Sequence, residues 1–167
     1  RRVLFRSPKV YGGFNTSLSW KGFDLSAIFA YSIGGYIYNR DITMILHNGS
    51  LEGRDWSTEI LKRWTPENRY TDVPALSTTS NNWNSASTRF LQNNSYMRLK
   101  NLTLSYDLPK QWISKLALSS VQVFVQGDNL FTIHRNQGLD PEQGITGITY
   151  YRYPAMRTIS GGINLSF

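Results

Sequence analysis

The sequence predicts an all-β fold, in which antiparallel strands form part of a transmembrane β-barrel with long extracellular loops. Ser, Thr, Asn, Gly and Tyr are abundant, which is typical of antiparallel β proteins. No run approaches the roughly 20 apolar residues of a transmembrane helix. Near the end of the chain, Ile163, Leu165 and Phe167 point to one side of a strand and the small or polar residues between them point to the other. Lipid around a barrel requires such an exposed apolar stripe, whereas soluble sheets avoid it.

Composition and charge narrow the class of protein. The 167 residues carry a formal net charge of +7 and no cysteine, which excludes disulfides and cysteine-based metal sites. Residues 1–7 do not match the pattern that follows, and we interpret them as non-native flanking sequence. The alternating pattern is already under way where residue 8 begins, and we interpret residues 8–167 as a fragment of a longer protein. A basic balance also suits nucleic-acid binders, but the sequence has no basic stripe, and we interpret the charges as scattered over loops and membrane interfaces.

The clearest local element is a hairpin that begins shortly after the flanking residues 1–7. Residues 11–20 and 23–32 both alternate apolar and polar side chains, as strands with two different faces do. Between them, Lys21 and Gly22 form a two-residue turn in which glycine supplies a positive φ. We therefore expect two antiparallel neighbouring strands here.

The alternation then stops over residues 33–95, a segment far longer than an ordinary connection. Within it, residues 36–47 and 57–64 space their apolar side chains in a helical manner, and Ser57 starts the second of these helices. We expect a long, functional loop with helical parts. A second long loop is predicted at residues 132–156.

Three further strands are predicted at residues 96–108, 121–131 and 157–167. In the first of them, Leu102, Leu104 and Tyr106 alternate with polar residues, yet Arg98 and Lys100 fall on the same apolar side. Basic side chains are tolerated there only at the level of the lipid headgroups, or if a β-bulge shifts the alternation. The sequence leaves both explanations open.

The predicted strand order can be tested against the placement of the loops. If Phe167 lies at the periplasmic edge, antiparallel order puts the short connections on that side and both long loops outside, as in outer-membrane barrels. Aromatic side chains of the predicted apolar face then gather at two levels, which we interpret as girdles. The inner girdle is Trp20, Phe23, Tyr106 and Phe167, and the outer girdle is Phe14, Tyr31, Tyr96, Phe131 and Tyr153. The alternative fold is a soluble β-sandwich, whose outward face would be polar.

No catalytic or metal-binding pattern occurs in the sequence, and we expect neither an enzyme nor a cofactor. His47 and His134 lie in different loops, and we interpret Asp140 and Glu142 as turn-forming or solvated acids rather than cation ligands. Aromatic residues of the long loops are candidates for contact with a substrate or a lid, with internal packing as the alternative. They are Trp56, Trp64, Tyr70, Trp83, Tyr150 and Tyr151.

Several segments resemble one known family, in the family's order. They are residues 11–14, 20–25, 34–39, 63–68, 71–74, 95–106, 126–132 and 138–142, together with the terminal strand. In these segments the chain resembles the carboxy-terminal barrel region of SusC/RagA-type TonB-linked outer-membrane transporters of Bacteroidetes. The resemblance implies that the chain supplies about five strands of a large, plugged barrel in the cell outer membrane.

The resemblance also implies a function and partners. It implies import of oligosaccharides or peptides, a SusD-like surface lipoprotein as lid, and energy from the TonB complex acting on a plug outside this chain. The terminal strand of the family is recognised by the barrel-assembly machinery, which implies that role for Ser160, Gly162, Leu165 and Phe167. The functional alternative is a soluble carbohydrate-binding β-sandwich whose aromatic loops form the site.

Overall fold

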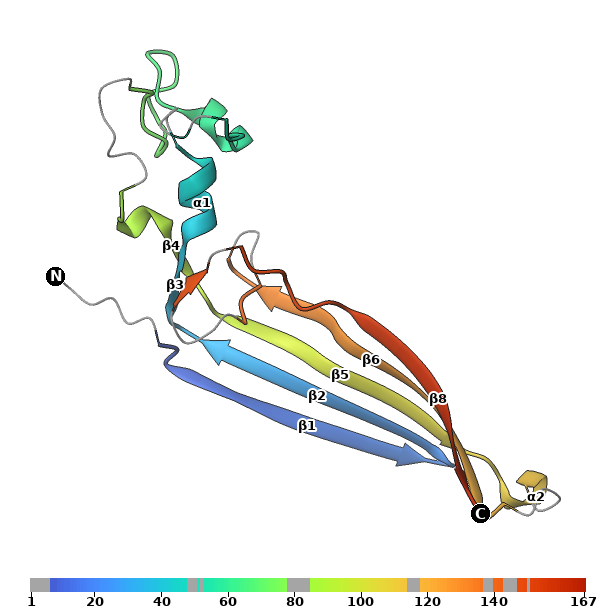
Figure 1. The fold of residues 1–167 in the computed structure, drawn as a ribbon. Helices are drawn as coiled ribbons and strands as arrows, with labels where there is room; N and C mark the ends of the chain where they lie inside the picture. The colour runs from blue at the N-terminus through green and yellow to red at the C-terminus, as the bar shows by residue number, and fades with distance from the viewer. Residues whose placement is uncertain are drawn as a thin grey trace.

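The computed structural model describes residues 7–47, 51, 53–77, 85–113, 118–136, 140–142, 147–149 and 151–167. Its five long strands are β1 (Val10–Trp20), β2 (Phe23–Ile33), β5 (Tyr96–Asp107), β6 (Ser120–His134) and β8 (Thr158–Ser166). They form one antiparallel sheet in the order β1-β2-β5-β6-β8, so each long strand pairs with the next one along the chain (Figure 1). The predicted antiparallel all-β fold is confirmed.

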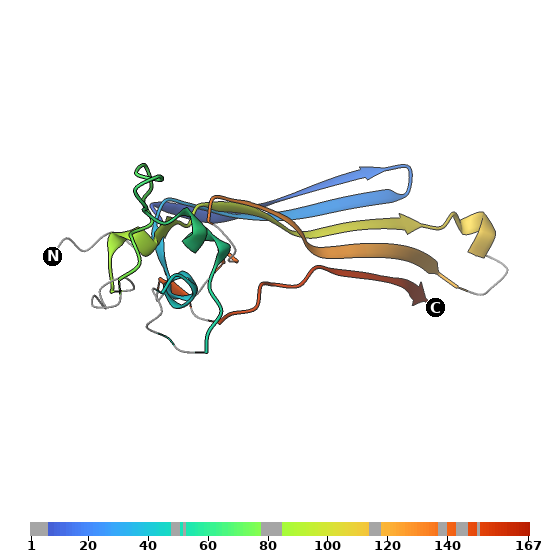
Figure 2. The ribbon, with the colours of Figure 1, turned by 90° about the horizontal axis from the view of Figure 1, so that it is seen from above.

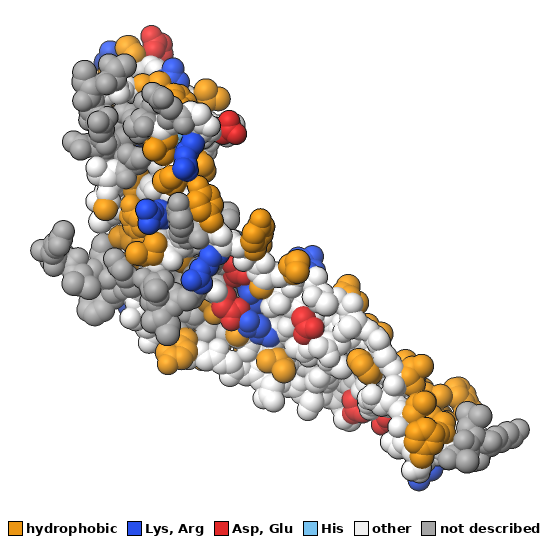
Figure 3. Space-filling model, in the orientation of Figure 1, with side chains coloured by type: hydrophobic (Ala, Val, Ile, Leu, Met, Phe, Trp, Pro, Cys, Tyr) orange, Lys and Arg blue, Asp and Glu red, His pale blue; other side chains and the backbone are white. Residues whose placement is uncertain are grey.

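The two faces of this sheet differ in chemistry. The register aligns apolar side chains in rows across the strands, and one row, Leu18, Leu25, Leu104 and Val125, is between 39% and 67% exposed. The opposite face carries rows such as Ser17, Ser26, Thr103, Gln126 and Ser160. We call these the apolar face and the polar face. In Figure 3 the visible face of the sheet is mostly polar between its two ends. An apolar face of this extent fits lipid rather than water.

A β-bulge decides which residues share a face in β5. The register of β5 shifts against both neighbouring strands at Lys100. A bulge adds one residue, so side chains above it change face relative to those below. Arg98 therefore lies on the polar face, opposite to Leu102, and the bulge explanation for Arg98 is confirmed. For the same reason the assignment of Tyr96 to the apolar face is wrong, because Tyr96 pairs with Ser32 of the polar face.

The two long loops meet at one end of the large sheet (Figures 1 and 2). There β3 (Tyr36–Asn39) pairs antiparallel with β4 (Leu91–Asn93) of its own loop and parallel with β7 (Ile148–Thr149) of the other loop. We call the described residues of 34–95 and 135–157 the loop unit. This small sheet lies beyond the end of the large one rather than stacked on it, so the described residues do not form a β-sandwich.

Short helices complete the loop unit and the opposite end. The helix predicted at residues 36–47 is wrong in its first turn, because Ile37 is buried in strand β3, and helix α1 spans only Arg40–Ile45. Ser57 caps the 3-10 helix η1 (Thr58–Lys62), as predicted. A second 3-10 helix, η2 (Thr88–Phe90), precedes β4, and α2 (Lys110–Ile113) lies in the connection at the far end. None of the helices in the described residues has the length and hydrophobicity that crossing a membrane requires.

Candidate functional site

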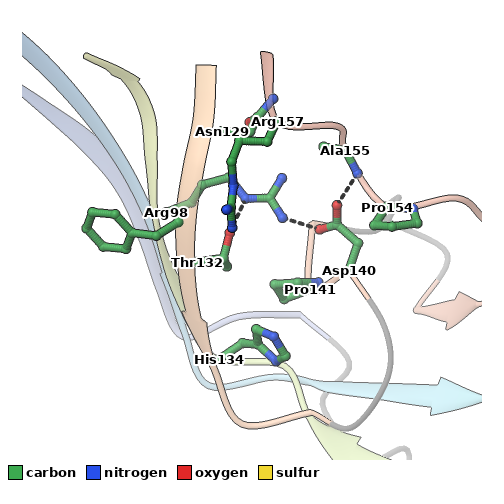
Figure 4. A pocket seen from close by; sticks show the side chains of 10 residues that line it. Arg98, Asn129, Thr132, His134, Asp140, Pro141, Pro154, Ala155 and Arg157 are labelled. Atoms are coloured by element: carbon green, nitrogen blue, oxygen red, sulfur yellow. Dashed lines mark hydrogen bonds and ion pairs between the residues drawn. The ribbon is translucent and has the colours of Figure 1, made fainter. Parts of the chain in front are cut away.

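A buried, ion-paired cluster joins the large sheet to the second long loop. Arg98 of β5, only 3% exposed, donates from its guanidinium to Asp140 and, at 2.8 Å, to Glu142. Its Nε–H donates to the hydroxyl of Thr132 on β6, also at 2.8 Å. Lys100 forms a second ion pair with Glu142. We call these five residues the Arg98 cluster; Figure 4 shows the guanidinium between the strand and the loop.

Asp140 is the hydrogen-bonding centre on the loop side of the cluster. One carboxylate oxygen also accepts from the backbone N–H of Glu142 at 2.9 Å, and the other accepts from the N–H of Ala155 at 2.7 Å. Burial raises the pKa of this carboxyl, but the hydrogen bonds from Ala155, Glu142 and Arg98 outweigh burial and hold the pKa of Asp140 below its ordinary value. The carboxylate is therefore ionised at neutral pH.

The interpretation of Asp140 as a turn-forming acid is confirmed, because its side chain accepts from the N–H of Glu142 two residues later. The interpretation of the two acids as solvated is wrong, because both carboxylates bind Arg98 and the Asp140 side chain is only 6% exposed. The sequence carried a signal for this pairing. Two basic residues, Arg98 and Lys100, stand in a strand that otherwise alternates, and two acids stand together in a loop. Buried charges require partners of opposite sign, so the two basic residues of the strand and the two acids of the loop are candidates to pair with each other.

Two cavities flank the cluster at the end of the sheet where the two long loops meet. The larger, about 490 Å³, lies between the end of β6 and the segment that leads into β8 (Figure 4). The ladder between β6 and β8 ends at Asp128 and Thr158, so β6 has no β8 partner beyond this point. A smaller cavity of about 230 Å³ is also lined by Arg98 and Asp140. Exposed Arg152 lines the smaller cavity and Arg157 the larger one, which suits both to polar solutes.

The loop aromatics predicted as contact residues fall into two groups. Trp56 is 42% exposed with its ring 5.5 Å from that of His47, and Arg54, two residues earlier, donates to the Tyr151 hydroxyl at 3.0 Å. Trp64 and Tyr70 lie instead around η1, where Tyr70 is fully exposed beside a shallow cavity of about 670 Å³. Trp83 and Tyr150 lie outside the described residues. Contact of these side chains with a substrate or lid stays a prediction.

Six of the nine predicted girdle residues lie in rows on the apolar face, and Tyr96, Tyr153 and Phe167 do not. Trp20, Phe23 and Tyr106 are aligned across three strands, with the rings of Phe23 and Tyr106 4.4 Å apart. Nearer the loops, Phe14 stacks on Phe29 with 4.7 Å between ring centroids. Phe131 belongs to the row of Phe14, and Tyr31 belongs to the next row towards the loops. Tyr153 and Phe167 lie outside the strands, and their side chains are 96% and 89% exposed. Their position in a membrane stays a prediction.

The terminal strand has a packing feature that the sequence did not indicate. Ser160 and Gly162 lie on the polar face and Leu165 on the apolar face. A Cβ at Gly162 would lie 2.8 Å from the ring of Phe124 on β6, so this position accepts the aromatic ring only because it lacks a side chain. Recognition by the assembly machinery stays a prediction for these residues and for Phe167.

Comparisons with known proteins agree with this architecture, although no family model matches the chain. TonB-dependent receptor P3 of Formosa agariphila is 33% identical over 96% of this chain and 16% of the relative. TonB-dependent receptor P26 of the same organism is 29% identical over 96% of this chain and 17% of its own length. TonB-dependent receptor SusC of Bacteroides thetaiotaomicron is 27% identical over 99% of this chain and 16% of its own length. The chain thus spans about a sixth of these relatives.

Solved structures show the same likeness. The structure of the RagAB peptide transporter matches with a TM-score of 0.86 and 34% identity, over 97% of this chain and 18% of that chain. The RagAB peptide importer in its "closed-closed" state matches with a TM-score of 0.83, also at 34% identity, over 96% of this chain and 17% of that chain. Sequence and fold agree over almost the whole chain, which therefore belongs, as a segment of the β-barrel, to the SusC/RagA type of TonB-dependent receptors.

Proposed function

We propose that the chain forms part of the wall and the outer mouth of a TonB-dependent importer in the outer membrane. One observation carries this proposal: a single antiparallel sheet exposes apolar rows on one face and polar rows on the other, with both long loops at one end. In a barrel of this kind the apolar face contacts lipid and the polar face lines the lumen. The loop unit then lies on the extracellular side.

The substrates we propose are oligosaccharides or peptides. Similarity to a peptide transporter supports the peptides, and the oligosaccharides are what the resemblance to the SusC/RagA family implies. The loop unit presents exposed Trp56 and Tyr70, and aromatic rings of this kind pack on sugars or on apolar side chains. Relatives of the chain are receptors and transporters, and we propose binding and transport rather than catalysis.

We also propose three partners for the complete receptor. A SusD-like lipoprotein covers the loop unit, the TonB complex acts on a plug, and the barrel-assembly machinery recognises the terminal strand. Similarity to the RagAB importer, whose name joins two components, supports the first partner. The loop unit supports it as well, since its two loops form one continuous surface through the pairing of β3 with β7.

Deletion of the receptor gene in the source bacterium, followed by uptake measurements, tests the proposal. Fluorescently labelled oligosaccharides and peptides would be offered separately, and the full-length receptor would be restored from a plasmid. We expect uptake of one class to fall on deletion and to recover with the restored receptor, but not when TonB is absent. Unchanged uptake of both classes in the deletion strain, together with absence of the restored receptor from outer-membrane fractions, would refute the proposal.

A further inference from the structure

The Arg98 guanidinium contacts more separate segments than a single surface ion pair would. It lies on β5, donates to Thr132 on β6, and binds both Asp140 and Glu142 in the second long loop. Through Asp140 it is linked to the N–H of Ala155, in the segment that leads into β8. One side chain therefore connects two strands of the sheet with the second long loop, including the segment that leads into β8.

We propose that Arg98 is a positioning residue, which fixes the whole loop unit to the barrel wall. The proposal rests on the proposed function only in placing the loop unit at the outer mouth. Three ion pairs of this cluster join loop and sheet: Arg98 with Asp140, Arg98 with Glu142, and Lys100 with Glu142. Besides these, Asn129 donates to the carbonyl of Met156 at 3.2 Å, a neutral and exposed contact.

Fixing one loop fixes both, because the two loops are joined to each other at several points. The parallel pairing of β7 with β3 connects them through the backbone. Asn94 donates to the carbonyl of Pro141 at 2.9 Å, and Asp41 accepts from the N–H of Tyr151 at 3.0 Å. The first loop is also held at its base, where the N–H of Gly34 donates to the Ser95 hydroxyl at 2.9 Å. Beyond this base, its position is linked to the attachment of the second loop through these contacts.

Burial explains why the guanidinium is needed at this site. The side chains of Arg98 and Asp140 are 4% and 6% exposed, whereas those of Lys100 and Glu142 are about one-third exposed. Removing one partner of a buried pair leaves the other charge without compensation, so without Arg98 the Asp140 carboxylate gains by moving to water and takes the loop with it. A lysine replaces the arginine only in part, because its ammonium is a single point charge. The planar guanidinium instead spreads its donors over three nitrogens, and Nε, Nη1 and Nη2 each reach a different partner.

The test uses the full-length receptor in outer-membrane vesicles and measures how fast trypsin cleaves after Arg135 and Arg152, which are exposed residues of the second loop. We expect Arg98→Gln to speed cleavage at least tenfold and Arg98→Lys to speed it partly, while heat-modifiable mobility shows an intact barrel. Arg69→Gln is the matched control: it removes an exposed guanidinium whose Nε–H donates only to the Pro66 carbonyl, and it should leave the rate unchanged.

A double-mutant cycle separates positioning from general destabilisation. Asp140→Asn alone should also release the loop, but the double variant with Arg98→Gln should be cleaved no faster than either single variant, since it leaves no buried charge unpaired. Additive effects, or unchanged cleavage in Arg98→Gln, would overturn the proposal. If Arg98→Gln does not fold, Asp140→Asn and Glu142→Gln test the same contacts from the loop side.

The outcome is distinguishable from failure of the proposed function. Suppose that Arg98→Gln is cleaved faster, but the unmodified receptor imports neither substrate class. Arg98 would then remain a positioning residue, and only the transport proposal would be refuted. Unchanged cleavage in an importing receptor would refute only the role of Arg98.

Discussion

Arginine substitutions along β5 test whether the apolar face contacts lipid. Leu102 lies in the row of Ala27 and Gly127 on that face, four residues from Tyr106 of the inner aromatic row. The next residue, Thr103, belongs to the polar face. Leu102→Arg and Thr103→Arg therefore introduce the same charge at the same height on opposite sides of one strand.

The structure sets the size of the expected difference. With a rise of about 3.3 Å per residue and a tilt of about 40°, Leu102 lies about 10 Å from the level of Tyr106, near the middle of an apolar band of about 25 Å. An arginine facing lipid at the midplane costs about 2–4 kcal/mol, and about 0–1 kcal/mol near the interface. Leu102→Arg should therefore shift the folding equilibrium about 30- to 900-fold, and Leu104→Arg, one row nearer the interface, should shift it less.

Urea titrations of the complete receptor in lipid vesicles would measure these effects, with heat-modifiable mobility reporting the folded fraction. We expect the loss in free energy of unfolding to decrease in the order Leu102→Arg, Leu104→Arg, Tyr106→Arg. Thr103→Arg should cause a smaller loss than Leu102→Arg. If Thr103→Arg costs as much as Leu102→Arg, or if the cost does not vary along the strand, the assignment of the two faces to lipid and lumen is refuted.

Three further predictions follow from the terminal strand and the loop. Gly162→Ala should lower the folded amount of receptor in outer membranes because its Cβ meets the Phe124 ring, and adding Phe124→Leu should restore it; no restoration would contradict this packing. Because the pKa of Asp140 is depressed, the loop should stay attached as pH falls through the ordinary carboxyl range and be released only below it, as hydrogen exchange would show; release already near pH 5 would contradict it. Phe167→Ala should lower the folded amount in cells but leave refolding into vesicles unchanged if the residue acts in assembly, and equal losses in both assays would assign it to stability instead.

The strands were predictable because their pattern is local. From Tyr11 to Ser32 the sequence contains two alternating strands and the turn between them, and the register pairs Trp20 directly with Phe23. A period of two is specific to extended strands and needs no knowledge of distant residues. The loop unit had no such local pattern. Tyr38 pairs with Ile148 of the other loop, and this pairing overrides the helical spacing in which Tyr38 stands.

The bulge at Lys100 shows where local reasoning ends. From the strand alone, Arg98 at the headgroups and Arg98 on the polar face are equally consistent with the sequence. The pairing of β5 with its neighbours decides between these two positions of Arg98. The register shift also involves β6, where Asn129 adopts a positive φ of 52°. Once the bulge places Arg98 on the polar face, its buried charge must be compensated there, and Asp140 and Glu142 of the loop are its partners. The side of the wall on which one arginine lies is thus coupled to the position of a loop more than forty residues later in the sequence, where Asp140 accepts its hydrogen bond.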